Sequence, residues 1–124
     1  VEDGPTMTHG GMPHGAGYVA AVKARARVVV DPRSYAAPRM AAVYERYPHL
    51  AAVLPAMGYS ALQLADLQDT INATPADVVV CATPIDLAAL LRLERPVVRA
   101  RYEYADAGEP TLGPIIDAAV GIAA

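Results

Sequence analysis

The chain has 124 residues, a length typical of one domain, and 54% of them are apolar, which excludes a disordered or fibrous protein. Its formal net charge is −3 without any block of like charges, so the sequence disfavours nucleic acid or an acidic membrane as the main partner. No apolar run is long enough to span a membrane. A single cysteine, Cys81, gives neither a disulfide framework nor a zinc site. We therefore expect a cytoplasmic protein whose one thiol is buried in a strand.

Short apolar runs alternate with segments of helical periodicity, a pattern typical of βα units around a mainly parallel sheet. We predict a single α/β domain over residues 1–124, with a three-layer arrangement. It consists of a mainly parallel sheet of four or five short strands with helices on both faces. The expected strands are one that ends at Val1, followed by Val28–Val30, Ala51–Leu54, Val78–Cys81 and Val97–Tyr104.

Helices are predicted from apolar periodicity and from capping signals. Ser60 and Gln63 have the spacing of a capping box. Thr83 is a predicted N-cap, with Pro84 and Asp86 favouring the same helix N-terminus. The expected helices are Gly15–Ala26, with Tyr18, Val19 and Val22 on one side; Ala37–Tyr47, with Met40, Val43, Tyr44 and Tyr47 on one face; one from Ser60, with Leu62, Leu64, Leu67 and Ile71; one from Thr83; and one from Thr111.

Two of the expected strands differ in pattern. Val78–Cys81 is apolar throughout, as expected for a strand that helices cover on both faces. In Val97–Tyr104, the charged residues Arg99, Arg101 and Glu103 alternate with apolar ones. This period of two indicates an edge strand with one solvated face.

The segment Glu2–Gly17 is the most informative for function, since it contains two carboxylates, two histidines and five glycines. We predict a loop over Glu2–His14 that runs from the end of a strand to the start of a helix. Ligands of open α/β sheets bind outside the carboxyl ends of strands, and helix N-termini attract phosphates. We therefore interpret the segment as a phosphate-binding loop. The alternative is a glycine-rich connector with surface histidines.

Chemical roles can be assigned within this segment. Glu2 and Asp3 are candidate Mg²⁺ ligands, and His9 is a candidate phosphate donor or general acid/base. His14 is a rival to His9 and could equally cap the following helix. The glycine spacing matches neither a Walker A loop nor a dinucleotide fingerprint.

Two further predicted strand ends carry polar residues. Arg33, in Asp31-Pro32-Arg33, is a candidate phosphate ligand, with a solvated loop arginine as the alternative. Thr83–Asp86 is either a third part of the site or a helix cap without a ligand. Because the carboxyl ends of parallel strands meet at one edge, we expect these loops to assemble one site. His49 has no evident partner and is interpreted as a surface residue.

Several ordered motifs give the chain a resemblance to a known family. They are Glu2–Thr6, Thr8–Met12, Gly15–Val19, Val30–Arg33, Tyr47–His49, Leu54–Tyr59, Thr70–Ala73, Ala82–Leu87 and Gly108–Leu112. Together they resemble the C-terminal region of cyclic 2,3-diphosphoglycerate synthetase and of its bacterial relatives, described as predicted GTPases. The motifs span nearly the whole chain and are specific because they are long, ordered and rich in uncommon residue combinations.

The resemblance implies a phosphoryl-transfer enzyme of the P-loop NTPase type that uses Mg²⁺ and ATP or GTP. The synthetase itself uses ATP to close an intramolecular phosphoanhydride on 2,3-diphosphoglycerate. In this family the P-loop lies upstream of the matched region. We therefore expect this chain to begin mid-domain, as the C-terminal segment of a larger protein whose nucleotide-binding part is absent. Alone, it is expected to be inactive and to bind no cofactor.

The expected site joins the matched positions to the residue pattern. His9 and Asp3 are the expected catalytic residues, and Glu2 and Asp3 the metal ligands. The expected substrate-binding residues are Thr6, Thr8, Gly10, Gly11, Gly15, Gly17 and Arg33. The expected partners are the remainder of the parent chain, a phosphorylated small molecule and, as a further option, a second copy of the chain.

Three functions remain open at this point. The chain is an enzyme segment that contributes a phosphate-binding loop, a non-catalytic structural or dimerisation module of its parent, or a free-standing domain that binds a small anion. An open parallel strand edge also predicts that the isolated chain is marginally stable or self-associates.

Overall fold

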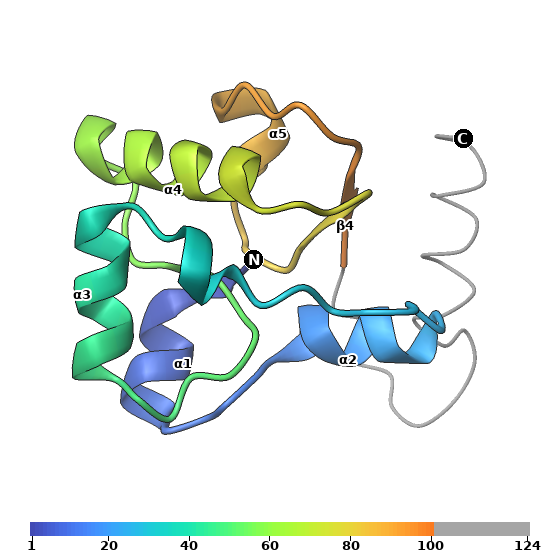
Figure 1. Cartoon of the computed structure of the whole chain (residues 1–124), viewed down its shortest axis with the longest axis horizontal. Coiled ribbons are helices and arrows are strands. Elements are labelled where there is room, and N and C mark those ends of the chain that lie inside the picture. The colour runs from blue at the N-terminus through green and yellow to red at the C-terminus, as the bar shows by residue number, and fades with distance from the viewer. Residues whose placement is uncertain (101–124) are drawn as a thin grey trace.

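The computed structural model describes residues 1–100, in which short strands alternate with helices (Figure 1). The helix predicted from Thr111 lies outside these residues, as does the end of the strand predicted over Val97–Tyr104. In chain order the elements are β1 (Glu2–Asp3), α1 (Gly4–Gly10), α2 (Ala16–Lys23), η1 (Pro32–Tyr35), α3 (Pro38–Arg46), β2 (Pro55–Ala56), α4 (Ala61–Ala73), β3 (Val79–Cys81), α5 (Leu87–Leu90) and β4 (Val97–Arg99).

The strands of the described part form two small parallel pairs, β1 with β2 and β3 with β4. Glu2 lies opposite Pro55 in the first pair, and Val79 lies opposite Val97 in the second. A single parallel bridge between Glu2 and Ala82 joins the pairs. All four strands therefore run in one direction, as the mainly parallel prediction requires. A continuous sheet of four or five strands in three layers stays a prediction.

β1 lies between β2 and β3 and is hydrogen-bonded to both sides. The ammonium group of Val1 donates to the carbonyl oxygen of Val80 (2.7 Å), and the Ala82 N–H donates to the carbonyl oxygen of Val1 (2.9 Å). On the other side, the Glu2 N–H donates to the carbonyl oxygen of Leu54 (2.9 Å). The first residues of the chain thus connect segments that follow them by more than fifty positions.

Helices α3 and α4 confirm their predictions. In α3, Met40 and Tyr44 are buried, and the two other residues of the predicted face are partly buried against the same core. In α4, the capping box is complete: the Ser60 hydroxyl accepts from the Gln63 N–H, and the Gln63 side chain accepts from the Ser60 N–H. Local capping and periodicity are therefore enough to define these two helices.

The buried faces of two helices differ in part from the predicted ones. In α2, Gly17 and Ala20 are buried, whereas Val22 is 52% exposed. In α4, Leu67 is buried as expected, but Leu62 is 63% exposed. Both helices carry more apolar residues than one face can bury, so periodicity alone does not decide which of them is covered.

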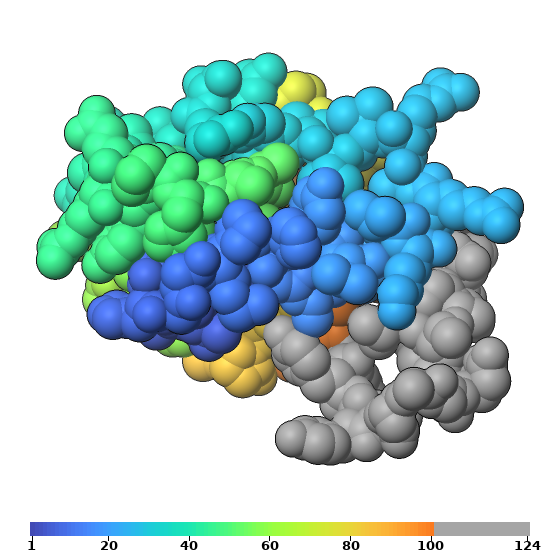
Figure 2. Space-filling model, turned by 90° about the horizontal axis from the view of Figure 1, so that it is seen from below, coloured from blue at the N-terminus to red at the C-terminus, as the bar shows by residue number. Residues whose placement is uncertain are grey.

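The structure corrects the prediction of a loop over Glu2–His14, because this segment contains helix α1. Pro5 stands in the first turn, where its missing N–H removes no helical hydrogen bond. Gly11 ends the helix in the left-handed region, at φ 67° and ψ 20°, which glycine adopts without strain. Proline near the start and glycine just past the end are helix signals that the loop interpretation overlooked. The space-filling view from below shows α1 at the molecular surface (Figure 2).

Two predicted strands are also corrected. Val28–Val30 has no regular structure, and Val28 is 69% exposed. A strand needs a neighbour for its backbone groups, and no strand of residues 1–100 pairs with this segment. The strand predicted over Ala51–Leu54 lies instead at Pro55–Ala56. Pro55 is tolerated in this strand because the Glu2 N–H of β1 bonds to the carbonyl oxygen of Leu54, and no Pro55 N–H is needed.

The helix predicted to start at Thr83 begins later, at Leu87, and is only four residues long. Its N-cap is Asp86, whose side chain makes no capping hydrogen bond. The Thr83 hydroxyl donates to the carbonyl oxygen of Ile85 (2.8 Å), so this group stabilises a local turn instead of a helix N-terminus.

The core joins the strands to α1, α3 and α4. Leu50, Leu67 and Leu87 are among its most deeply buried side chains. Cys81 is 1% exposed, which confirms its predicted burial, and this burial raises the pKa of its thiol. Within residues 1–100, no helix is long and apolar enough to cross a membrane.

Candidate functional site

The carboxyl ends of β1, β2 and β3 lie at one edge, and helices α1, α4 and α5 follow them. The start of α1 packs tightly on the end of β2: a Cβ atom on Gly4 would lie 2.6 Å from the carbonyl oxygen of Ala56. Tyr59, between β2 and α4, has a buried hydroxyl without a partner among the described residues. Its burial, and secondly the charge of Asp3, raise the pKa of Tyr59. Asp3 lies opposite Ala56 in the pairing of β1 with β2, and Tyr59 follows Ala56 by three residues.

Asp3 is half-buried between the end of β1 and the start of α1. Its Oδ2 accepts a hydrogen bond from the exposed Thr6 hydroxyl (2.6 Å). The first strand was predicted to end at Val1, but β1 comprises Glu2 and Asp3, so Asp3 is the last residue of the strand instead of the start of a loop. Asp3 and Thr6 form a polar pair that points away from the core.

Glu2 lies on the other side of β1, because successive side chains of a strand point to opposite faces. It is only 2% exposed, and its Oε1 accepts a hydrogen bond from the Tyr18 N–H (2.9 Å) in the first turn of α2. Cβ atoms on Gly15 and Gly17 would lie 2.7 and 2.9 Å from the Glu2 carboxylate oxygens. The two glycines thus make room for a carboxylate of the protein itself. The Glu2 carboxylate therefore binds the N-terminus of α2, where the sequence analysis predicted a bound phosphate.

The two predicted metal ligands therefore face different surroundings. Glu2 is turned toward α2, so Glu2 and Asp3 do not fit a single Mg²⁺ ion. No cluster of three or more His, Cys, Asp or Glu residues in the described part could hold a metal. Asp3 alone fits the usual Mg²⁺ arrangement of one or two carboxylates completed by substrate phosphates and water.

His9 lies in the last turn of α1 and is exposed. Its Nδ1 is 3.0 Å from the Thr8 Oγ1 and 3.3 Å from the carbonyl oxygen of Pro5. Thr8 itself is buried, and its hydroxyl donates back to the Gly4 carbonyl oxygen (3.1 Å), a bond internal to the helix. His9 follows Asp3 by six positions, which corresponds to about 9 Å along a helix axis. The two predicted catalytic residues therefore stand at opposite ends of α1.

The side chains of Tyr47 and His49 lie beside the C-terminal half of α1. His49 is not the partnerless surface residue that was predicted, since its Nε2 lies 2.9 Å from the carbonyl oxygen of Met7. The Tyr47 ring lies 6.4 Å from the His9 ring and 6.2 Å from the His49 ring, between centroids. The guanidinium of Arg46 lies 5.5 Å from the centre of the same tyrosine ring. The Tyr47-Pro48-His49 motif was the available signal for this cluster.

The remaining glycines and His14 connect α1 to α2. Gly10 ends α1, Gly11 is its left-handed cap, and both are exposed. His14 stacks on the Tyr18 ring, with centroids 4.6 Å apart, and the N-cap of α2 is Gly15. His14 is therefore not a helix cap.

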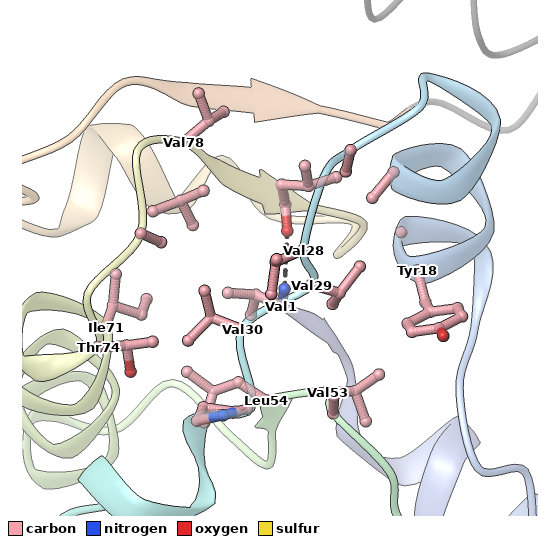
Figure 3. A pocket seen from close by; sticks show the side chains of 18 of the residues that line it. Val1, Tyr18, Val28, Val29, Val30, Val53, Leu54, Ile71, Thr74 and Val78 are labelled. Carbon is pink, nitrogen blue, oxygen red and sulfur yellow. Dashed lines mark hydrogen bonds between the residues drawn. The ribbon is translucent and has the colours of Figure 1, made fainter.

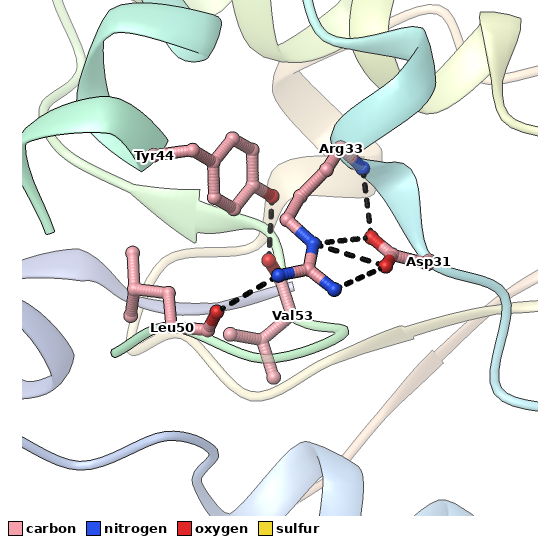
Figure 4. Close-up of polar contacts among 5 residues, drawn as sticks. All are labelled: Asp31, Arg33, Tyr44, Leu50 and Val53. Carbon is pink, nitrogen blue, oxygen red and sulfur yellow. Dashed lines mark hydrogen bonds and ion pairs between the residues drawn. The ribbon is translucent and has the colours of Figure 1, made fainter. Parts of the chain in front are cut away.

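Arg33 is held by an ion pair on η1 (Figure 4). Its Nε donates to both carboxylate oxygens of Asp31 (2.9 Å each), and its Nη1 donates to the carbonyl oxygen of Leu50 (3.4 Å). The hydrogen bond from the Arg33 side chain lowers the pKa of Asp31. Beside this pair, the Tyr44 hydroxyl donates to the carbonyl oxygen of Val53 (2.5 Å). Because Val28–Val30 is not a strand, Arg33 does not follow a strand of the sheet.

Parallel strand pairs and intervening helices define the chain as an α/β protein. No protein family matches the chain, and no solved structure does. Among curated proteins, arginine synthetase ArcE of Thermococcus kodakarensis is 50% identical over 117 residues, which are 94% of this chain and 26% of that protein. The chain thus spans about a quarter of the length of this relative. The match confirms similarity to a synthetase over nearly the whole chain.

Proposed function

We propose that this chain is one domain of a nucleotide-dependent synthetase and supplies part of its phosphate-handling site. The observation that carries the proposal is the 50% identity with arginine synthetase ArcE over 94% of the chain. A P-loop that binds ATP or GTP would then lie in the remainder of the parent, and this domain would be its C-terminal part. The product of the parent would be arginine or a closely related compound.

Phosphoryl transfer connects this proposal to the resemblance with cyclic 2,3-diphosphoglycerate synthetase. A synthetase drives an uphill bond formation by cleaving a nucleoside triphosphate, and Mg²⁺ usually neutralises the phosphate charge in such sites. The shared chemistry is therefore the activation of an oxygen on a small substrate. Arginine synthesis and cyclisation of a diphosphate differ in the acceptor, which other parts of the parent would bind.

Asp3 and Thr6 are the residues of this domain best placed for phosphate chemistry. They stand at the carboxyl edge of β1, where open α/β sheets bind ligands. Asp3 would hold Mg²⁺ together with phosphate oxygens, and the Thr6 hydroxyl would orient its carboxylate through the 2.6 Å hydrogen bond. The unpartnered hydroxyl of Tyr59 would donate to Asp3 or to a phosphate oxygen.

His9 would transfer a proton at a separate part of the bound substrate, since it stands about 9 Å along α1 from Asp3. The exposed backbone at Gly10 and Gly11 would approach the same part of the substrate. Glu2, Gly15 and Gly17 would support the site indirectly, by holding α2 against β1.

The test uses the parent protein and the reverse reaction, which needs no knowledge of the forward co-substrates. Arginine is mixed with Mg²⁺, ADP and phosphate, or with AMP and pyrophosphate, and the ATP formed is measured with luciferase; GDP with phosphate is tested by GTP release. In parallel, consumption of ATP with 2,3-diphosphoglycerate tests the cyclising activity. Formation of nucleoside triphosphate that depends on arginine supports the proposal.

Variants assign the role of this domain. Asp3→Asn should lower turnover by at least 100-fold, and His9→Ala by roughly 10²–10⁴-fold if it transfers a proton. Asp69→Asn, on the exposed side of α4, is the matched control and should keep wild-type turnover. If both site variants keep wild-type turnover and substrate affinity, the domain is a structural or dimerisation module of its parent.

A further inference from the structure

A hollow of about 480 Å³ lies beside β1 and β3 (Figure 3). Its lining is mostly aliphatic, with Val28–Val30, Val53 and Leu54 on its walls. Neither ion pair found within residues 1–100 lies in this lining, so the walls hold no fixed pair of opposite charges that would select a ligand. A smaller cavity, of about 140 Å³, does contain such a pair.

The smaller cavity lies between α3, α4 and the carboxyl end of β2. Helices α3 and α4 pack against each other here (Figure 1). Its apolar walls come from all three elements and consist of Met40, Val43, Pro55, Ala56, Met57 and Leu67. Because methionine side chains are flexible, the two methionines let these walls adapt to an apolar group. The volume suits an apolar chain of about four heavy atoms, at roughly 30 Å³ for each, the share of one water molecule in the liquid.

An ion pair stands in the lining of this cavity. Arg39, in the first turn of α3, donates from its Nε to the Oδ2 of Asp66 (2.5 Å) and from its Nη2 to the Oδ1 (3.0 Å). The Asp66 side chain is 11% exposed, whereas the Arg39 side chain is 62% exposed. The pair thus joins a nearly buried carboxylate to a guanidinium that solvent reaches. Because solvent screens such a pair, it adds little to the stability of the α3–α4 packing.

The ion pair leaves hydrogen-bonding groups of both signs for a ligand. Asp66 engages the Nε and Nη2 side of the guanidinium, and within residues 1–100 no hydrogen bond reaches the Nη1 of Arg39. The edge formed by Nη1 and Nη2 has the geometry that binds a second carboxylate through two parallel hydrogen bonds. Each Asp66 oxygen accepts one bond from Arg39 and has a further lone pair that accepts from an ammonium group. A ligand with neighbouring carboxylate and ammonium groups is therefore complementary to the pair.

We propose that this cavity binds a free α-amino acid with an uncharged, unbranched side chain. The α-carboxylate binds the Nη1–Nη2 edge of Arg39, the α-ammonium donates to Asp66, and the side chain enters the apolar cavity. A side chain that ends in a guanidinium would lose its hydration against apolar walls, so arginine fits this cavity poorly. The inference therefore goes beyond the function proposed above and does not depend on it.

Calorimetric titration of the parent protein with L-norleucine, whose side chain is a butyl group, tests the proposal. Wild type should show saturable binding. Hexanoate lacks the ammonium group and pentylamine lacks the carboxylate, so each leaves half of the ion pair without a partner and should bind at least tenfold more weakly. Arginine should not compete with norleucine, even if it binds elsewhere in the parent as the product of the reaction.

Matched variants locate the site. Arg39→Ala and Asp66→Asn should each weaken norleucine binding at least tenfold. Their controls are Arg92→Ala, at an exposed position outside the cavity, and Asp69→Asn, on the exposed side of α4, and both should keep wild-type affinity. Val43→Phe fills the cavity without removing a charge and should also weaken binding at least tenfold. This variant repeats the test if a charge variant unfolds by circular dichroism.

Four results would each overturn the proposal. They are the absence of saturable binding at millimolar norleucine, equally tight binding of hexanoate or pentylamine, wild-type affinity in both Arg39→Ala and Val43→Phe, and displacement of norleucine by arginine. None of them bears on whether the parent forms a nucleoside triphosphate from arginine, so this proposal and the proposed function can fail separately.

Discussion

Glu2→Ala is the sharpest test of the interpretation that the Glu2 carboxylate caps α2. The variant leaves the Tyr18 N–H without its 2.9 Å acceptor, which costs about 1–3 kcal/mol for a poorly solvated donor. It also removes a negative charge from a helix N-terminus, a loss of about 0.3–2 kcal/mol. Relief of the desolvation of a carboxylate that is 2% exposed offsets part of this loss. We expect a net decrease in the free energy of unfolding of about 2–4 kcal/mol.

Urea unfolding of the 124-residue chain, followed by circular dichroism, measures this change. Glu2→Gln keeps an oxygen acceptor in place and loses only the charge, so it should cost about half as much as alanine. Glu45→Ala, at an exposed position of α3, is the matched control and should change stability by less than about 0.5 kcal/mol. If Glu2→Ala matches Glu45→Ala, or if the Tyr18 amide exchanges no faster in Glu2→Ala than in wild type, the capping role is wrong.

Three further outcomes are expected. Ser60→Ala should lower the free energy of unfolding by about 1 kcal/mol in urea, because it removes the hydroxyl of a complete capping box; an unchanged midpoint would contradict this. Because burial raises the pKa of the Cys81 thiol, its reaction with a disulfide reagent at pH 8 should be at least 100-fold slower in the folded than in the unfolded chain, and equal rates would count against the packing. Arg33 lowers the folded-state pKa of Asp31, so their ion pair stabilises the protein above the ordinary aspartate pKa of about 3.9 and loses this effect as the pH falls through the lowered value. Arg33→Gln should flatten this acid-side decrease between pH 5 and 2, and an identical pH profile would refute the assignment.

Local signals were sufficient for some elements of the fold. The capping box and the apolar period predicted α4. Pro38 in the first turn of α3, together with the spacing of Met40 and Tyr44, predicted α3. The apolar run predicted β3 to within one residue. Helix α1 was missed although its signals are also local, because Pro5 and Gly11 were interpreted as loop residues instead of as helix boundaries.

Strand pairing depends on residues that are distant in the chain, so it could not be predicted locally. Val28–Val30 has stronger β-forming residues than Pro55–Ala56, yet only Pro55–Ala56 pairs with β1. A strand forms where a partner offers donors and acceptors in register, and no pattern within three residues contains that information. This explains why the parallel direction was right although the strands expected at Val28–Val30 and Ala51–Leu54 were not found there.

The candidate site was predictable where it depends on neighbouring residues and unpredictable where it does not. Alternation along β1 places Asp3 and Glu2 on opposite faces, but the strand was expected to end at Val1, so this rule was not applied and both residues were predicted as metal ligands. By contrast, the contact between His49 and the Met7 carbonyl oxygen joins residues 42 positions apart. The charge of Asp3 likewise acts on Tyr59, a residue 56 positions further along the chain that follows β2, the partner strand of β1.

The central place of β1 also bears on the order in which the chain can fold. Val1 bonds to Val80, 79 residues further along the chain, so β1 cannot be paired on its β3 side until almost the whole described part has left the ribosome. Such distant pairing closes a large loop and is slow compared with helix formation. Helices α3 and α4, whose contacts are closer in sequence, should therefore form and pack first, and β1 should insert last between β2 and β3.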